Sequence, residues 1–435
     1  MRLREGTALA RLRPRASALA LARRLILRRS KGGQRAEARG LPRVRPARCP
    51  AHAGNGREAD IGHINSITGL NGTITASVAT FEVDQAALNE VVGGFAISDT
   101  AANVQAGLAA LQGDASQITS ITATGVRVAV GNGLFVADKA ALNEIVGGFD
   151  ILGQASVLQG NLAGLVADTS HIGSITALNG AITTNVATFE ADETTLNKIV
   201  GGFAISDTAA NVVGGLTALT ADAGHIASIT ATDTAVSVGV GKFIPDQAAL
   251  DKIAGGFAIL GQSAVISTNF DALAADVSHI QSVAFADASP VLRLSQTQAA
   301  ADAGLLAKIT GSYVLDVANP GGSTTTTGHG DGLTINAVAT GADTITGGGS
   351  SESFVLPPNF GSDAITDFSQ HLWSPGADAI TLPSSDFANF TAMLGDAKTV
   401  GGANTVITAA NGDALTLLNL TTSTLATAGA DFKFA

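Results

Sequence analysis

Hydrophobic positions recur in the same order along successive stretches of this chain. In one stretch the valines Val236, Val238 and Val240 alternate with other residues, which places them on one face of a strand. An Ala/Leu-rich stretch follows and ends at Gly-Gly. This arrangement predicts a short helix with an aspartate at its start and a glycine C-cap. The aspartates in the four copies are Asp84, Asp138, Asp192 and Asp246.

A second strand and a second helix follow each Gly-Gly. Phe95 to Ile97 predicts the strand, and Ser98 with Asp99 predicts a helix cap. The apolar residues after this cap are spaced by three and four positions, so they share one helix face. They are Ala101, Val104, Leu108 and Leu111. A further β-rich run, Ile118 to Ile121, leads into the next copy.

Two sequence tags show that these copies have a period of 54 residues. The tag [HQ]IxS[IV] starts at His63, Gln117, His171, His225 and His279, and Gly-Gly-Phe starts at Gly93, Gly147, Gly201 and Gly255. The fifth copy lacks Gly-Gly-Phe and has AKITGSYVLD from Ala307 instead, as expected of an atypical terminal unit. No copy carries enough apolar surface to fold alone. We therefore predict that residues 59–318 form a repeat solenoid of five units, built from short β-strands and α-helices.

The basic residues are concentrated at the start of the chain. Sixteen of the 25 Lys and Arg lie in residues 1–60, which leaves 9 bases against 32 acids in the remainder. In residues 1–58 the apolar runs are broken by arginines, so this segment is a poor secretory signal. We interpret it as a basic, disordered leader or a wrongly included upstream segment, although an organelle transit peptide shares its composition. No Met lies between Met1 and Met393, which counts against a simple start error.

Charge and cysteine content exclude several classes of function. So few cations in the acidic body disfavour binding to nucleic acid or to an anionic membrane surface. No run of 18 apolar residues is present, so we expect no transmembrane segment. Cys49 is the single cysteine, which excludes a disulfide framework and a cysteine-based zinc site in the body.

The recurring histidines and glycines each allow two interpretations. Stacked histidines could form a ladder of metal ligands, but Gln117 interrupts it and we find no carboxylate recurring beside it. A side chain that hydrogen-bonds a turn is the alternative that we favour. The Gly-Gly pairs lack the spacing of phosphate-binding loops, so we assign them to helix termination.

The composition changes after Asn319. Residues 319–330 are rich in Gly, Ser and Thr and predict a linker. Three nine-residue frames follow that approximate GGxGxDxUx, the β-roll repeat in which glycines turn the chain, the aspartate reaches calcium and U points inward. They span His329–Ala337, Val338–Thr346 and Gly347–Val355. The sixth position holds Thr334 in the first frame, Asp343 in the second and Glu352 in the third.

Residues 331–435 carry several ordered motifs beyond these frames. GxDxIxDF is present as Gly361, Asp363, Ile365, Asp367 and Phe368, and GxDxIxL as Gly376, Asp378, Ile380 and Leu382. TVIxxxxGDxLTLxxL follows from Thr405, and DFxF from Asp431. Over about 105 residues this segment resembles the end of the repeats-in-toxin (RTX), or hemolysin-type calcium-binding, proteins that bacteria export by type I secretion.

The resemblance implies a mostly β, β-roll-like C-terminal domain that binds calcium and directs export without an N-terminal signal peptide. The type I secretion apparatus would be one partner, and an unknown extracellular or cell-surface molecule another. The candidate calcium ligands are Asp343, Glu352, Asp363, Asp367 and Asp378. The alternative is that these acids cap turns and keep the surface soluble.

No catalytic motif is evident. HExxH, the Gly-x-Ser-x-Gly elbow and a Walker loop are all missing from the sequence. We therefore expect a non-enzyme: a secreted repeat protein, extracellular or at the cell surface, with an adhesive, matrix or surface-structural role. The alternatives are a secreted toxin and a hydrolase-like effector of the hemolysin type.

Overall fold

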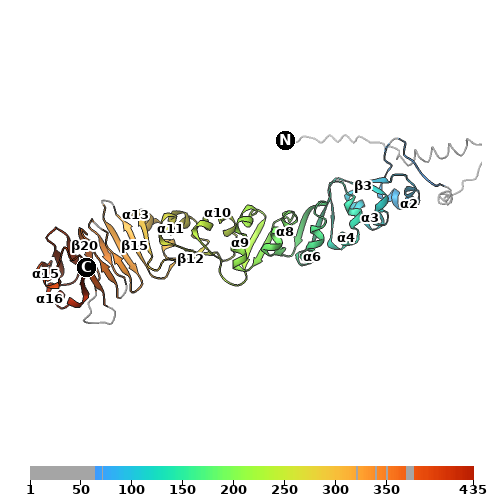
Figure 1. Ribbon diagram of the computed structural model, residues 1–435. Coiled ribbons are helices and arrows are strands. Elements are labelled where there is room, and N and C mark those ends of the chain that lie inside the picture. Colours follow the sequence, from blue (N-terminus) through green and yellow to red (C-terminus); the bar gives the residue numbers. More distant parts are fainter. Residues whose placement is uncertain (1–63, 71, 320–321, 339, 349–350, 369–376) are drawn as a thin grey trace, which may run out of the picture. The chain divides into compact units, whose positions relative to one another are not determined.

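The computed structural model describes residues 64–70, 72–319, 322–338, 340–348, 351–368 and 377–435 (Figure 1). The predicted leader, His63 and Gly376 lie outside these residues. The chain forms two compact units, the first up to Thr183 with Ala191–Phe203, the second Thr184–Glu190 with Ala204–Ala435. The fold is mixed α/β, with short strands in parallel sheets and one mixed eight-stranded sheet.

The first unit contains two three-stranded parallel sheets with helices between their strands. The sheets are ordered β1-β2-β3 and β4-β5-β6. Their strands are β1 (Thr75–Ala76), β2 (Phe95–Thr100), β3 (Ile118–Thr124), β4 (Val128–Val130), β5 (Phe149–Gln154) and β6 (Ile172–Leu178). The helices are α2 (Val78–Asn89), α3 (Ala101–Gly113), the 3-10 helix η2 (Ala115–Gln117), α4 (Asn132–Ala137), α5 (Lys139–Asn143), α6 (Ala155–Gly160) and α7 (Leu162–Val166). Helix α8 (Val186–Leu196) has residues in both units.

The second unit begins with sheets of the same kind, ordered β7-β8-β9 and β10-β11-β12-β14. The strands are β7 (Thr183–Thr184), β8 (Phe203–Asp207), β9 (Ile226–Ala231), β10 (Ser237–Val238), β11 (Phe257–Gly261), β12 (Ile280–Phe285) and β14 (Ile309–Thr310). The helices are α9 (Ala209–Ala221), α10 (Val240–Leu250), α11 (Ser263–Thr268), α12 (Phe270–Ala275), α13 (Gln296–Ala301) and α14 (Ala303–Leu306).

Each central strand starts at the phenylalanine of Gly-Gly-Phe, which is fully buried. Phe95, Phe149 and Phe257 each pack against a phenylalanine of a preceding helix, with ring centroids 5.9 to 6.1 Å apart. In all three cases the pairing with the next strand shifts directly after this residue. Buried aromatic pairs therefore fix where these strands begin.

Helix α3 shows how the predicted apolar face is used. Ala101, Val104, Leu108 and Leu111 are all buried, as predicted. The helix cap is Thr100, whose hydroxyl accepts a hydrogen bond from the backbone N–H of Asn103. Asp99 instead accepts from the backbone N–H of Val78 at the start of α2. This aspartate therefore joins the starts of two helices.

The prediction of a strand through Val236, Val238 and Val240 is only partly correct. All three side chains are buried, but β10 has two residues and Val240 begins helix α10. The predicted helix start at Asp246 is a kink inside α10. A short strand that continues directly into a helix also buries every second residue. Alternation of apolar residues therefore did not distinguish a longer strand from a strand followed by a helix.

The C-terminal part of the second unit forms two further sheets. The mixed sheet has the order β13-β15-β16-β18-β20-β24-β23-β22, and the parallel sheet β17-β19-β21-β25. The first sheet comprises β13 (Val291–Ser295), β15 (Tyr313–Ala318), β16 (Thr324–His329), β18 (Thr344–Thr346), β20 (Ser362–Ile365), β24 (Ala414–Leu417), β23 (Asn404–Thr408) and β22 (Ala397–Val400). The second comprises β17 (Thr334–Asn336), β19 (Ser353–Val355), β21 (Ala379–Leu382) and β25 (Phe432–Phe434). Short helices α15 (Phe390–Gly395) and α16 (Thr422–Leu425), and the 3-10 helix η3 (Gly429–Asp431), complete the chain.

Successive strands from β16 to β21 alternate between these two sheets, and their central apolar residues form one core. Ile335, Ile345, Phe354, Ile365 and Ile380 are each at most 1% exposed and belong to the same cluster. The predicted linker 319–330 is incorrect for Thr324–His329, which form β16 and pair with both β15 and β18. Threonine is β-branched and favours strands, and this property outweighed the linker-like composition.

Helices in the described residues are short. The longest, α3 and α9, have 13 residues each. Within the described ranges, none has the length and hydropathy of a membrane span.

The two glycines before each central strand make different demands. Gly147 and Gly148 have φ values of +83° and +75°, so replacing either one with a residue that has a Cβ lowers the free energy of unfolding. A Cβ on Gly147 would meet nothing within 4 Å, whereas a Cβ on Gly148 would lie 2.3 Å from the carbonyl oxygen of His171.

We expect Gly148→Ala to lower the free energy of unfolding more than Gly147→Ala does. The control should cost roughly 1–2 kcal/mol from its backbone conformation alone, and Gly148→Ala clearly more because backbone must move. Urea unfolding followed by circular dichroism measures both. Equal losses would contradict the role assigned to the close contact with His171.

Candidate functional site

Four of the five predicted calcium ligands lie at the starts of the C-terminal strands. Asp343, Glu352 and Asp378 directly precede β18, β19 and β21, and Asp363 is the second residue of β20. Each is at most 2% exposed. Burial of a charged carboxylate is costly unless hydrogen bonds or a cation compensate it.

Backbone N–H groups satisfy two of the five acids. The carboxylate of Asp343 accepts from Thr324 N at 2.7 Å and from Val338 N at 3.2 Å. Asp367 accepts from Gly347 N at 2.8 Å and from Gly348 N at 3.0 Å. These two carboxylates cap turns, as the alternative interpretation of the sequence proposed.

Glu352 is in a different situation. Both of its carboxylate oxygens are buried and accept no hydrogen bond from the described residues. Its backbone N–H donates to Asp378 Oδ1 at 3.0 Å, so the two acidic side chains are adjacent. Burial, followed by the hydrogen bond and charge of Asp378, raises the pKa of Glu352 to about 7; the charge of Asp331 adds to this. The hydrogen bond with Asp378 requires a proton on one of the two acids, so no donor among the described residues compensates the charge of the ionised glutamate.

Asp363 resembles Glu352 in one of its two carboxylate oxygens. Its Oδ1 accepts from Asp343 N at 3.0 Å, but its Oδ2 is buried and accepts nothing from the described residues. Burial, with smaller contributions from the charges of Asp343 and Asp413, raises its pKa to about 7. Only one group of three or more acidic or histidine ligands within 4.8 Å of one another occurs in the described ranges, and it contains none of these five acids.

These observations decide which residues fit calcium. Calcium takes six to eight oxygen ligands, from carboxylates, carbonyls and water. Both carboxylate oxygens of Glu352 and one of Asp363 accept no hydrogen bond from the described residues, and a calcium ion could use them. Asp343 and Asp367 already use their oxygens to hold turns. The five predicted ligands therefore divide between two roles and do not form one cluster.

The recurring histidines lie in tight turns and contact an aspartate three residues earlier. The Nδ1 atom of His225 lies 2.7 Å from Asp222 Oδ1, and that of His279 lies 2.5 Å from Asp276 Oδ1. His171 Nδ1 lies 3.4 Å from Asp168 Oδ1. The expectation that no carboxylate recurs beside the histidines is therefore wrong. Asp114, Asp168, Asp222 and Asp276 recur with the same period of 54, a signal visible in the sequence but overlooked because they are not adjacent to the histidine.

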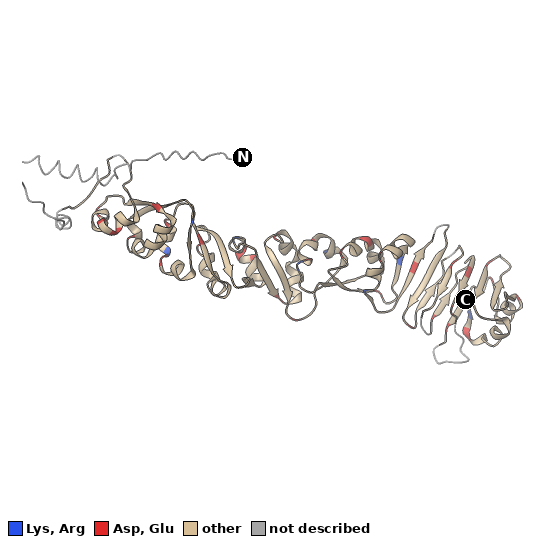
Figure 2. Ribbon diagram, turned by 180° about the vertical axis from the view of Figure 1, so that it is seen from behind, with Lys and Arg blue, Asp and Glu red and all other residues tan. Residues whose placement is uncertain are grey.

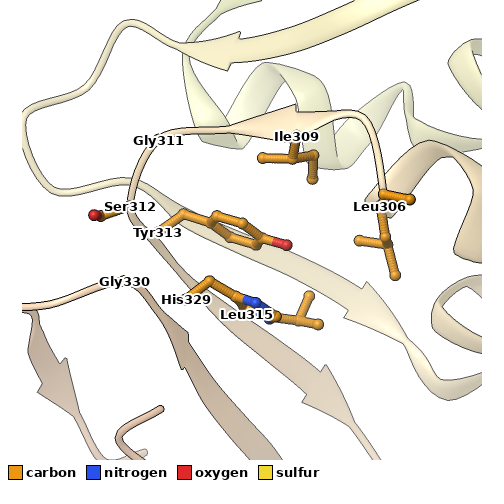
Figure 3. Close-up of a pocket in the computed structure, with 9 residues that line it drawn as sticks. Leu306, Ile309, Gly311, Ser312, Tyr313, Leu315, His329 and Gly330 are labelled. Carbon is orange, nitrogen blue, oxygen red and sulfur yellow. The ribbon is translucent and has the colours of Figure 1, made fainter. Parts of the chain in front are cut away.

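A shallow pocket opens beside β15 and β16 (Figure 3). Tyr313 and His329 line it with their rings stacked, the centroids 4.5 Å apart and the planes 8° apart. Burial raises the pKa of Tyr313 and lowers that of His329. The remaining lining is aliphatic, glycine or serine and includes no carboxylate. The pocket thus offers an aromatic pair rather than an acid and base.

Acidic positions outnumber basic ones along the described ribbon (Figure 2).

None of the protein-family models, curated proteins or solved structures compared with the chain matches it.

The raised pKa of Glu352 predicts a pH-dependent stability. An acid that binds its proton more tightly in the folded state stabilises the fold below its unfolded pKa of 4.5 and loses this contribution as pH rises through about 7. In EDTA, we expect the unfolding free energy of the C-terminal region to fall between these values. Glu352→Gln should remove about 3 kcal/mol of that fall.

Urea unfolding at pH 4.5 and pH 8 measures this change. Asp367→Asn is the control, because Asp367 accepts two N–H groups and has no unpaired oxygen among the described residues. A Glu352→Gln protein with the full pH dependence of the wild type would contradict the assignment.

Proposed function

We propose that this chain is a secreted, non-enzymatic repeat protein with an adhesive, matrix or surface-structural role. In this proposal residues 59–318 form the solenoid of five units, and the C-terminal residues form an RTX-like, β-roll-like domain that binds calcium and directs type I export. The single observation that carries the calcium part is Glu352, a buried acid beside Asp378 whose carboxylate oxygens accept no hydrogen bond from the described residues.

Equivalent contacts 54 residues apart support the solenoid. Parallel bridges join Ile67 to Val91, Ile121 to Ile145, Ile175 to Ile199 and Ile229 to Ile253. In each pair the first residue is the last position of the [HQ]IxS[IV] tag, and its partner stands two residues before Gly-Gly. The same tags thus make the same contact in four successive copies, as expected of stacked modules.

The alternation of strands between two parallel sheets supports a β-roll-like C-terminal domain. The second and third nine-residue frames place their U residues, Ile345 and Phe354, in the shared core, and their acids directly before the strand. Gly361, in the motif that follows, has a φ of +86°, and a Cβ there would lie 2.3 Å from the carbonyl oxygen of Gly341 one turn earlier. These are the glycine, acid and apolar roles that the repeat pattern implies.

A recurring exposed surface favours an adhesive or structural role. Val92, Val146 and Val200 precede Gly-Gly in three copies and are 63%, 64% and 62% exposed. Apolar side chains repeated at a fixed period present the same contact several times, which suits multivalent binding.

Calcium should raise the thermal stability of the C-terminal region at pH 8, because the ion supplies positive charge beside the buried carboxylate of Glu352. Glu352→Gln should unfold at a higher temperature than the wild type in EDTA, and gain much less from calcium. Asp367→Asn should be less stable under both conditions and keep its response to calcium. Differential scanning calorimetry with and without calcium makes the comparison; a wild-type protein that does not respond would refute calcium binding.

Export provides a separate test. In a bacterium with a type I secretion apparatus, we expect a chain without residues 319–435 to stay in the cell and a chain without residues 1–58 to reach the medium. Immunoblots of cells and medium distinguish the two. Secretion of the first chain, or retention of the second, would contradict a C-terminal export signal.

A further inference from the structure

One of the histidine turns differs from the others in the residue that faces it from the preceding helix. Asn143, at the end of α5, donates its amide to Asp168 Oδ1 at 3.0 Å. The equivalent position 108 residues later is Asp251, at the C-cap of α10. In this turn a carboxylate replaces the amide donor, so Asp251 and Asp276 face each other.

Three ligand atoms converge as a result. His279 Nδ1 lies 2.5 Å from Asp276 Oδ1 and 3.4 Å from Asp251 Oδ1. One ligand atom from each of these three residues lies within 4.8 Å of the others, the only such group in the described ranges. At metal–ligand bonds of about 2.0–2.2 Å, two ligands of a tetrahedral ion are about 3.4 Å apart. The pair of His279 and Asp251 already has this separation.

The aspartate between them is incompletely satisfied. Asp276 is 4% exposed, and its Oδ2 is buried without a hydrogen-bond partner among the described residues. The carboxylate of Asp251 lies close to it, and two carboxylates in contact repel each other unless a positive charge lies beside them. A bound cation would supply that charge.

No lysine or arginine of the described residues forms an ion pair with these carboxylates. Lys252 follows Asp251 in the chain, but the ion pairs of Asp251 and Asp276 are with His279. At the Asp168 turn, the ammonium of Lys139 lies 3.7 Å from Asp168 Oδ1. The equivalent residue at the Asp276 turn is Gln247, which is neutral. The ammonium of Lys308 lies near this turn, but it donates to the carbonyl oxygens of Val277 and Ile280.

We propose that Asp251, Asp276 and His279 bind a divalent transition-metal ion of the zinc class. An imidazole with two carboxylates suits zinc, whereas calcium prefers oxygen ligands alone. Three protein ligands leave at least one position for water or another molecule. The side chains of Asp251 and His279 are 38% and 41% exposed, so an ion can reach the site from solvent. This site is independent of the calcium proposal and lies in a different part of the chain.

Zinc titration of the full chain in excess calcium tests the proposal, because calcium occupies oxygen-only sites beforehand. Asp251→Asn and His279→Gln restore residues that occur at equivalent positions, Asn143 and Gln117, so both should fold as the wild type does. Each variant should lose one zinc ion per chain, or bind it at least tenfold more weakly, by isothermal titration calorimetry. Circular dichroism and the melting temperature check that the fold is retained.

The reverse exchange provides a gain of function. The double variant Asn143→Asp with Lys139→Gln gives the Asp168 turn the residues of the Asp276 turn, and it should bind one additional zinc ion. Zinc binding by Asp251→Asn that equals the wild type, or a double variant without an additional ion, would overturn the assignment.

Discussion

Backbone N–H groups at the starts of helices and strands are the constraint on which this structure depends. Short elements leave many such groups without a partner in their own element. Here a side chain from the next turn of the chain accepts them: Asp99 accepts from Val78, Asp207 from Val186, and Asp343 from Thr324. The sequence separations are 21, 21 and 19 residues. Each such bond fixes both an element start and the stacking of successive turns, with about 1.5–3 kcal/mol for a charged acceptor.

This use of carboxylates explains why the body of the chain can be acidic and poor in lysine and arginine. An aspartate that accepts two or three N–H groups is compensated without a basic side chain. The hydrogen bond from Asn211, with those from Val186 and Thr208, lowers the pKa of Asp207 despite its partial burial. Glu352 and Asp363 have raised pKa values because burial and neighbouring acids act on them without enough donors. Acidic side chains thus either accept N–H groups at the starts of elements or remain buried with a raised pKa, and the number of N–H donors distinguishes these two cases.

Much of the local structure could be predicted from the sequence. Phe95–Ile97 and Ile118–Ile121 lie in strands, and the face of α3 is buried as expected, because apolar spacing reports directly on burial. Val240 and the strand Thr324–His329 were assigned incorrectly, since neither alternation nor composition reveals which segment pairs with which. The candidate ligands were predicted by position, but their division into turn caps and unpaired acids depends on contacts between residues 19 to 26 apart.

Repetition makes departures from the common pattern informative. A side chain that is the same in several copies of the sequence repeat, such as the buried phenylalanine after Gly-Gly in four of them, serves a contact that these copies share. Asp251 differs from Asn143 in one heavy atom, yet this replaces a donor with an acceptor: Asn143 faces the buried Asp168, and Asp251 faces the equivalent Asp276. A change of this kind costs stability unless something binds there, and the shared fold does not require it, since an asparagine satisfies the contact elsewhere. Within a repeated sequence, chemistry specific to one site is therefore expected where one copy replaces the hydrogen-bond donor that other copies have.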